Sequence, residues 1–280
     1  MKNRTCGVHL RIVGLIALSW LFTSVTQAGA QQPITILPPT DGFKTLYRFC
    51  QGFTLANCGD TEFPNSPLTL DAAGNLWGTT IGDIFEIDST SHETQLLFFS
   101  SNVPNMGFFP TGGGVVLDDA GTPYTTTFLG GNFSAPPCSP PNEGCGAVTI
   151  NAGTSIYNFC SAPNCTDGAF PTGGLLRDAS GNLYGTASRG GANVSANNGA
   201  GGGVVFKLDP TGAYSVLYDF CSAANCTDGI VSRGITSASL IQDAAGNLYG
   251  VTGAGGASGK FPYYQSSRYR AYPSESRRSA

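Results

Sequence analysis

The cysteines are the residues of this sequence with the clearest chemical potential. Apart from Cys6, all of them occur in close pairs: Cys50/Cys58, Cys138/Cys145, Cys160/Cys165 and Cys221/Cys226. An even number of closely spaced cysteines is typical of a disulfide framework in an exported chain. Two pairs share the pattern Cys-Ser-x-x-Asn-Cys-Thr-Asp-Gly, which favours pairing within each local pair. Zinc binding is the alternative, but it needs four converging ligands, and His92 is the one histidine after residue 30.

The sequence contains no persuasive catalytic constellation. A Ser-His-Asp triad would have to be built around His92, which lies in a polar run between two predicted strands and is better explained as a solvated loop histidine. The Gly-rich stretch near Ser258 lacks the pattern of a nucleophile elbow, and Lys260 lacks that of a phosphate loop. We therefore predict no catalytic residue, no cofactor and no metal site.

An Asp-x-x-Gly pattern recurs along the chain, followed in its full form by Asn-Leu-Tyr-Gly. Asp accepts hydrogen bonds from backbone N–H groups two residues on, and Gly takes the positive-φ position, so each copy predicts a tight β-hairpin. The large ring after each turn is suited to packing between sheets. Calcium binding or paired carboxylates are alternative roles for these acids, but the turn already explains them. The turn residues are Asp71, Gly74, Asp118, Gly121, Asp178, Gly181, Asp243 and Gly246, and the rings are Trp77, Tyr124, Tyr184 and Tyr249.

Each turn belongs to a longer repeat. An apolar residue stands three positions before every Asp (Leu68, Val115, Leu175, Leu240), and the next position is often apolar too, which predicts a strand covered on both faces. Two more strand-like runs follow each of the first three turns: 84–88 and 95–99, 147–151 and 155–159, and 205–209 and 215–220. One repeat is thus four short antiparallel strands, and the turn glycines are 47, 60 and 65 residues apart, close to the period of propeller blades. The predicted fold is all-β, a propeller-like array of about three full blades and an incomplete fourth.

The repeats resemble those of the GloVer-type (choice-of-anchor) tandem-repeat proteins of bacteria. The units of this family read Asp-x-x-Gly-Asn-Leu-Tyr-Gly-Thr-Thr, a Gly-Gly, and then Gly-x-Val-Phe-Lys-Leu. Residues 181–186, 190–191 and 203–208 match best, and the second copy departs, with Thr122-Pro123 in place of Asn-Leu. The resemblance, over residues 44–259, implies β-propeller-like repeats and export, and it implies no established activity.

The chain divides into four parts. Residues 1–30 have basic residues, a short apolar run and a small-residue cleavage site, which predicts a secretory signal peptide; a retained anchor is the alternative. Residues 31–43 are a Pro-rich linker and residues 44–259 hold the repeats, beginning with an unpartnered strand at 44–49 that resembles a fourth strand. The pattern of the fourth repeat stops after residue 259, and residues 260–280 form a basic tail. We expect this tail to be disordered or the product of a frameshift, with a genuine polybasic tail as the alternative, and the protein to be aggregation-prone.

The net charge and the predicted export limit the classes of function that are open to this protein. Residues 31–259 carry six basic and seventeen acidic residues, a net charge of −11, which disfavours nucleic acid as a partner. No membrane span is expected after signal cleavage. The leading hypothesis is a secreted or cell-surface binding or structural module for an unknown extracellular ligand, a glycan or a protein. The alternative is an extracellular propeller enzyme, acting on a carbohydrate or lactone, with an acidic site at the central channel. Because antiparallel strands place the second-to-third and fourth-to-first connections on one side, we predict that the cysteine pairs mark the binding face.

Overall fold

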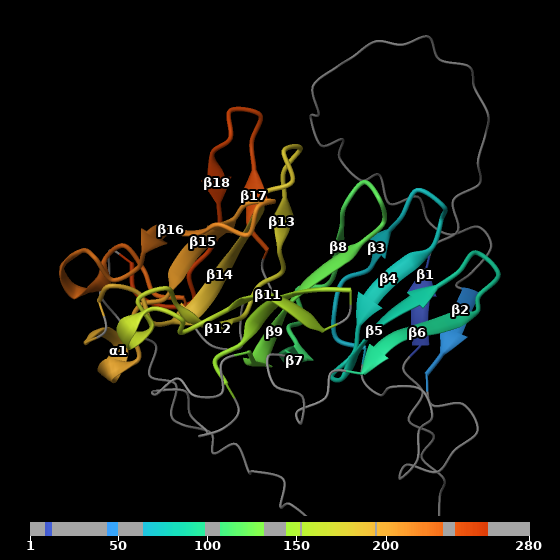
Figure 1. Ribbon diagram of the computed structural model, residues 1–280, viewed down its shortest axis with the longest axis horizontal. Coiled ribbons are helices and arrows are strands. Elements are labelled where there is room, and N and C mark those ends of the chain that lie inside the picture. The colour runs from blue at the N-terminus through green and yellow to red at the C-terminus, as the bar shows by residue number, and fades with distance from the viewer. Residues whose placement is uncertain are drawn as a thin grey trace, which may run out of the picture.

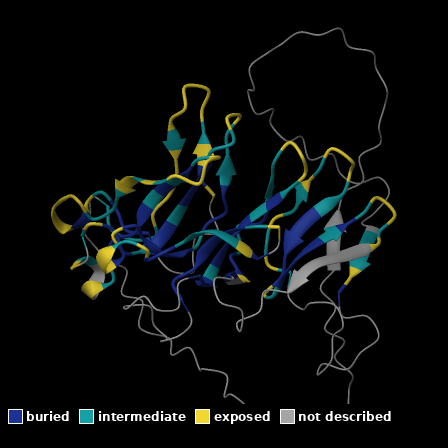
Figure 2. Ribbon diagram, viewed as in Figure 1, coloured by how far each residue is buried: buried dark blue, intermediate teal, exposed yellow. Residues whose placement is uncertain are grey.

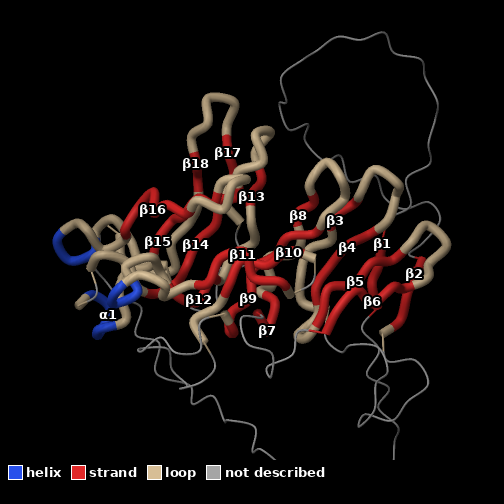
Figure 3. The backbone as a smooth tube through the Cα atoms, in the orientation of Figure 1, coloured by secondary structure: helices blue, strands red, loops and turns tan. Residues whose placement is uncertain are grey.

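The repeats fold as a row of antiparallel sheets (Figure 1; strands red in Figure 3). The structure, a computed structural model, describes residues 9–12, 44–49, 64–98, 107–131, 144–151, 153–193, 195–231 and 239–256. The predicted linker, the basic tail, most of the signal segment, and Cys50, Cys58 and Cys138 lie outside these residues.

The first sheet has the four strands expected of one repeat. It runs in the order β3-β4-β5-β6, with a register shift between Ile84 and Phe85. Its strands are β3 (Thr69–Leu70), β4 (Leu76–Thr79), β5 (Asp83–Ile87) and β6 (Glu93–Phe98). The β3–β4 connection is the Asp-x-x-Gly turn, so the turn and the strand order agree with the sequence prediction.

The second and third sheets repeat this plan with one addition. In each, the innermost strand is divided into two short pieces that both pair with the next strand: β7 and β8 with β9, and β12 and β13 with β14. The division falls at a Pro-Thr-Gly-Gly sequence, where proline cannot donate to the ladder and glycine lets the chain leave the sheet. The strands are β7 (Gly107–Pro110), β8 (Val116–Leu117), β9 (Pro123–Gly130), β10 (Ala147–Ile150), β11 (Thr154–Asn158), β12 (Ala169–Pro171), β13 (Leu176–Arg177), β14 (Leu183–Arg189), β15 (Val204–Leu208) and β16 (Tyr214–Asp219).

Within the described residues, the fourth repeat contributes two strands, β17 (Ile241–Gln242) and β18 (Leu248–Tyr249). Its outward face is open: Tyr249 is 52% exposed, whereas the equivalent Tyr184 of the third repeat is 8% exposed. Ile241 and Val251 are exposed on this repeat as well. The expectation that the inner strand is covered on both faces therefore fails here, because no further sheet among the described residues packs on it.

The strand that the sequence left without a partner is β2 (Lys44–Arg48). In the structure it pairs antiparallel with β1 (His9–Ile12), inside the predicted signal segment. Phe49, directly after β2, packs edge-on against Phe85 of the first sheet with ring centroids 5.0 Å apart. Phe159 of the second sheet meets Phe206 of the third in the same way, at 5.2 Å. β2 thus takes the place of a fourth strand preceding the first full sheet, in line with the sequence interpretation.

The core lies between neighbouring sheets (dark blue in Figure 2). Phe206, Leu208 and Val204 of β15 face the second sheet and are fully buried. At the inner connections the sheets meet backbone to backbone: a Cβ added to Gly113 would lie 1.9 Å from the backbone nitrogen of Gly174. Glycine is required there because any side chain would separate the two sheets.

In the part of the chain that the structure describes, helical structure is limited to single turns in the connections. These are α1 (Ala196–Gly199) and two 3₁₀ turns, Pro163–Cys165 and Ala224–Cys226. Within the described ranges, no helix has the length and apolar character needed to cross a membrane.

Candidate functional site

The two kinds of connection lie on opposite sides of the sheets. The Asp-x-x-Gly hairpin tips are at the upper side in Figure 1, whereas α1 is at the lower left and the disulfide connection that follows β16 is at the left. Cys145, in the connection before β10, lies beside Cys160 and Cys165, which precede β12. The predicted grouping of the cysteine connections on one side is therefore confirmed for these residues.

Each hairpin aspartate is a hydrogen-bonding centre for its own turn. In the third repeat, Oδ1 of Asp178 accepts the backbone N–H groups of Ser180 and Asn182, both at 2.9 Å. Oδ2 accepts the Asn182 side-chain amide at 2.7 Å and the Tyr184 hydroxyl at 3.0 Å. Gly181 follows with φ +83°. The predicted turn chemistry is confirmed, and the ring after the turn has a polar role that the sequence analysis missed.

The same network recurs with small changes. In the first repeat the Trp77 indole N–H takes the place of the tyrosine hydroxyl and donates to Asp71 at 3.1 Å. In the degraded second repeat Asp118 keeps its two backbone bonds and a 3.3 Å bond from Tyr124. Its hairpin is therefore regular although Thr122-Pro123 replaces Asn-Leu.

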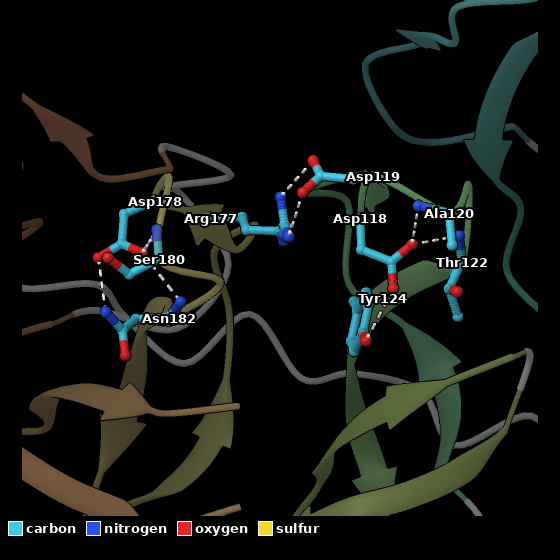
Figure 4. A network of polar contacts seen from close by, with 9 residues as sticks. All are labelled: Asp118, Asp119, Ala120, Thr122, Tyr124, Arg177, Asp178, Ser180 and Asn182. Carbon is cyan, nitrogen blue, oxygen red and sulfur yellow. Dashed lines mark hydrogen bonds and ion pairs between the residues drawn. The ribbon is translucent and has the colours of Figure 1, made fainter. Parts of the chain in front are cut away.

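Figure 4 shows how the second and third turns are linked. The Arg177 guanidinium, from β13, forms an ion pair with the Asp119 carboxylate at 3.2 Å. Asp119 is almost fully exposed, so this pair contributes at most about 1 kcal/mol. Asp118 and Asp178 each face their own turn, so the repeated acids do not form a paired-carboxylate site.

The turn hydrogen bonds lower the pKa of the aspartates. For Asp71 the Asn75 backbone N–H is the main cause, and for Asp243 the Asn247 side-chain amide is the main cause and lowers the pKa to about 2. For Asp118 and Asp178 partial desolvation acts in the opposite direction, yet the hydrogen bonds outweigh it and the pKa is lowered. These groups are charged at neutral pH and structural in role.

We predict that Asn247→Ala raises the pKa of Asp243 from about 2 towards its ordinary value of 3.8, because it removes the main hydrogen bond to the charged form. A lowered pKa in the folded state stabilises the turn above pH 4 and loses this effect as the pH falls towards 2. Carboxyl ¹³C NMR titration measures the change. Tyr249→Phe, which removes a smaller contribution, should raise the pKa less; the reverse order would contradict the assignment.

The disulfide connections form a second repeated module. Cys160 bonds Cys165, and Cys221 bonds Cys226, as the sequence predicted. An aspartate follows each pair and fixes the loop: Oδ2 of Asp167 accepts the Ser161 backbone N–H at 2.9 Å and the Tyr157 hydroxyl at 2.6 Å. Asp228 makes the equivalent bonds to Ser222 and Tyr218, at 2.8 and 3.0 Å. These aspartates therefore tie the disulfide loop to the preceding strand.

The first of these modules is also locked to the following sheet. The Tyr157 ring stacks on Tyr214 of β16, with centroids 3.8 Å apart, and the Tyr214 hydroxyl donates to the Asp167 carbonyl. Burial is the main cause that raises the pKa of both tyrosine hydroxyls, so both remain protonated donors. Tyr218 has no stacking partner of this kind among the described residues and is 43% exposed.

We predict that Asp167→Ala costs more stability than Asp228→Ala. Asp167 is buried and its removal leaves the Tyr157 hydroxyl without its acceptor inside the sheet interface, at a cost of about 1–3 kcal/mol. Asp228 makes the same bonds to exposed partners, which water can satisfy, so about 1 kcal/mol or less is expected. Urea unfolding of the two variants measures the difference, and equal losses would show that the tyrosine bond is not the source.

In the third and fourth repeats, the preceding disulfide loop packs against the Gly-Gly. The Gly191 N–H donates to the Cys165 carbonyl at 3.0 Å, and Gly256 donates to Cys226 at 3.1 Å. A Cβ on Gly190 would lie 2.2 Å from the Cys165 oxygen. The glycines are therefore needed for this close approach, which sequence reasoning saw only as a repeated motif.

A pocket of about 500 Å³ lies beside Gly190 and the Cys160–Cys165 loop. Its side chains include the three cysteines Cys145, Cys160 and Cys165, and Arg189, whose guanidinium lies 5.1 Å from the centre of the Phe170 ring. Asn164 and Ala200 also line it. The volume is in the range of small-molecule sites, and Arg189 is the charged residue of the lining.

Carboxylates and histidine contribute little to a reactive site in the part of the chain that the structure describes. There, the group of three potential metal-ligating side chains is that of Cys145, Cys160 and Cys165. His92 lies at the exposed turn before β6, where its Nδ1 is 2.7 Å from the Thr90 hydroxyl, as expected of a loop histidine. The pocket could have been predicted from the sequence, because the Gly-Gly, Arg189 and the cysteine pairs all fall in connections on the same side of the predicted sheets.

Comparison with known proteins gives a distant structural likeness. No protein-family model matches the chain. No curated protein matches it either. Among solved structures, a protein described as a candidate gluconolactonase is similar with 13% sequence identity and a TM-score of 0.39, over 66% of this chain. The match spans 55% of the length of that structure.

Proposed function

We propose that this chain is an exported binding module that holds an extracellular ligand on the side of the sheets where the disulfide connections lie. The observation that carries the proposal is the pocket of about 500 Å³ beside the Cys160–Cys165 loop. Disulfides persist in oxidising compartments, which supports export. Connections on a rigid scaffold are where recognition residues concentrate, which supports this side as the binding side.

The ligand we propose is a glycan with an acidic group. Arg189 lines the pocket, and a guanidinium is suited to paired hydrogen bonds with a carboxylate or sulfate. Asn164 is a further polar residue of the lining, and Ala169 and Phe170 are its apolar members. A mixed lining of this kind fits a sugar ring, which has apolar faces and a polar edge.

An oligosaccharide array that includes uronic-acid and sulfated glycans tests the proposal, with two matched variants. Ala200→Trp adds a large ring at the pocket, and Ala179→Trp adds the same ring at an exposed hairpin tip on the opposite side. We expect binding by the parent protein and Ala179→Trp, and loss of binding in Ala200→Trp. Binding that survives Ala200→Trp, or is lost in Ala179→Trp instead, would place the site elsewhere, and no glycan binding by the parent would overturn the proposed ligand.

A further inference from the structure

The third strand of a repeat carries a phenylalanine that lies over a glycine of the second strand. Phe85 of β5 and Phe206 of β15 are both fully buried. They pair across the ladder with Gly78 and Gly185. A Cβ added to either glycine would lie 2.5 Å from the ring of its partner. Glycine is therefore required where the ring passes over the second strand.

A leucine and a second aromatic ring complete this ring site. In the third repeat the leucine is Leu175, whose Cδ2 would lie 3.3 Å from a Cβ added to Gly185. The second ring follows the fourth strand of the preceding sheet, where Phe159 packs edge-on against Phe206 at 5.2 Å. The first repeat has the same arrangement. Each ring site thus has a glycine, a leucine and a phenylalanine as its walls, and the third strand fills it.

The second repeat shows that the glycine and the third-strand ring occur together. The residues that pair at this place are Thr125 of β9 and Thr149 of β10, and both are fully buried. This pair contains neither a glycine nor a ring. Within this chain, glycine at this position of the second strand therefore indicates a ring on the strand that pairs with it.

The fourth repeat has the walls of the ring site without the ring. Gly250 directly follows β18, and Leu240 is the described residue that a Cβ added to it would meet, at 2.8 Å. Gly250 is exposed, whereas the equivalent glycines of the first and third repeats are buried. Phe220 takes the place of Phe159 and is half-buried. Among the described residues, β18 pairs with β17 alone, so its outer edge is open.

Exposed apolar side chains surround this open edge. Tyr249 and Val251, on either side of Gly250, are 52% and 67% exposed. Tyr218, which packs edge-on against Phe220, is 43% exposed. A free strand edge with apolar surface beside it is a template for the addition of another strand, since the backbone groups supply affinity and the side-chain sites supply specificity.

We propose that the edge of β18 is a docking site for an extended segment of a partner protein, which adds a third strand to the fourth repeat and inserts a phenylalanine between Gly250, Leu240 and Phe220. The segment carries an aliphatic residue two positions after the phenylalanine, because Ile87 and Leu208 are buried at that position in the first and third repeats. None of the three wall residues lines the glycan pocket, so this interaction is independent of the proposed function.

A synthetic peptide with the sequence of residues 202–209, which includes β15, is the probe. It carries a fluorophore and is titrated with the full chain, and fluorescence anisotropy measures binding. We expect saturable binding that weakens about tenfold or more when the peptide contains Phe206→Ala, because the buried ring supplies much of the apolar contact. Equal binding of the two peptides would show that no ring is inserted. No binding at all would overturn the proposal, and it is the result expected if the chain's own residues after 256 fill the site.

Gly250→Val blocks the ring site from the side of the protein. Gly250 has no positive φ, and its added Cβ meets the flexible end of Leu240, so we expect the variant to fold. Ala244→Val adds the same side chain at the exposed tip of the same hairpin. Peptide binding should weaken about tenfold or more in Gly250→Val and stay within about twofold in Ala244→Val, with similar unfolding temperatures. Unchanged binding by Gly250→Val would contradict the site.

Sedimentation velocity distinguishes a separate partner from a second copy of this chain. We expect no dimer that depends on the β18 edge, so parent and Gly250→Val should sediment alike. If the parent formed a dimer that Gly250→Val dissociates, the occupant of the edge would be a second copy, and the proposal of a separate partner would be overturned.

Discussion

Replacing Gly190 by alanine is expected to lower the free energy of unfolding by about 3–5 kcal/mol, a loss typical of the most disruptive point mutations. Two causes add. Gly190 has φ +73°, where any L-residue is strained, and its added Cβ would lie 2.2 Å from the Cys165 carbonyl oxygen. That oxygen belongs to the disulfide loop, and the Gly190–Gly191 segment cannot move away without breaking the Gly191 bond to it. Urea unfolding followed by circular dichroism measures the loss.

Two other glycines separate these causes. Gly212 has φ +86° and no atom within 4 Å of an added Cβ, so Gly212→Ala reports the backbone strain alone, about 1–2 kcal/mol. Gly82 has open space and no positive φ, so Gly82→Ala should be neutral or slightly stabilising. If Gly190→Ala cost no more than Gly212→Ala, the close approach of the disulfide loop would not be a structural requirement.

Truncation of Phe206 to alanine is expected to cost about 3–5 kcal/mol, the range found for large buried rings. Phe206 is fully buried between the second and third sheets, with ring centroids 5.2 Å from Phe159 and 5.6 Å from Tyr214. Gly185 of β14 makes room for the ring, because a Cβ at that position would lie 2.5 Å from the Phe206 ring. Removal of the ring therefore leaves a cavity that the rigid ladder around it cannot close.

Phe220→Ala makes the same substitution at a less buried ring and serves as the control for this prediction. Phe220 has the same position after β16 as Phe159 has after β11, but it is half-buried and packs on Tyr218, which is itself exposed. We expect a loss of about 1–2 kcal/mol, since less apolar surface leaves the interior. Thermal unfolding of both variants gives the comparison. A loss at Phe220 equal to that at Phe206 would mean that the last repeat is covered in solution by something beyond the described residues.

Local chemistry determined the parts of this protein that the sequence predicts well. The Asp178 turn closes within six residues, since its partners are Ser180, Asn182 and Tyr184. The Cys160–Cys165 loop closes within five residues. Such interactions depend on spacing along the chain alone, so the hairpins, the local disulfides and the four-stranded repeat follow from the sequence.

The tertiary structure decided what depends on neighbouring sheets. Tyr184 and Tyr249 have the same local sequence, yet one is buried and the other exposed, because burial is set by whether another sheet packs on the ring. The close approach of Gly113 to Gly174 is likewise a contact between neighbouring repeats. No local pattern contains this information.

The candidate site follows the same rule. The sequence placed Cys145, Cys160 and Cys165 on one side of the sheets, which strand direction alone requires. The structure brings their sulfurs within 4.8 Å of one another and places a pocket lined by Arg189 beside them. Both features depend on how the loop after β11 packs against Gly190 and Gly191 of the next repeat. That docking is a contact between distant residues, held by hydrogen bonds from one repeat to the next, and only the folded structure fixes it.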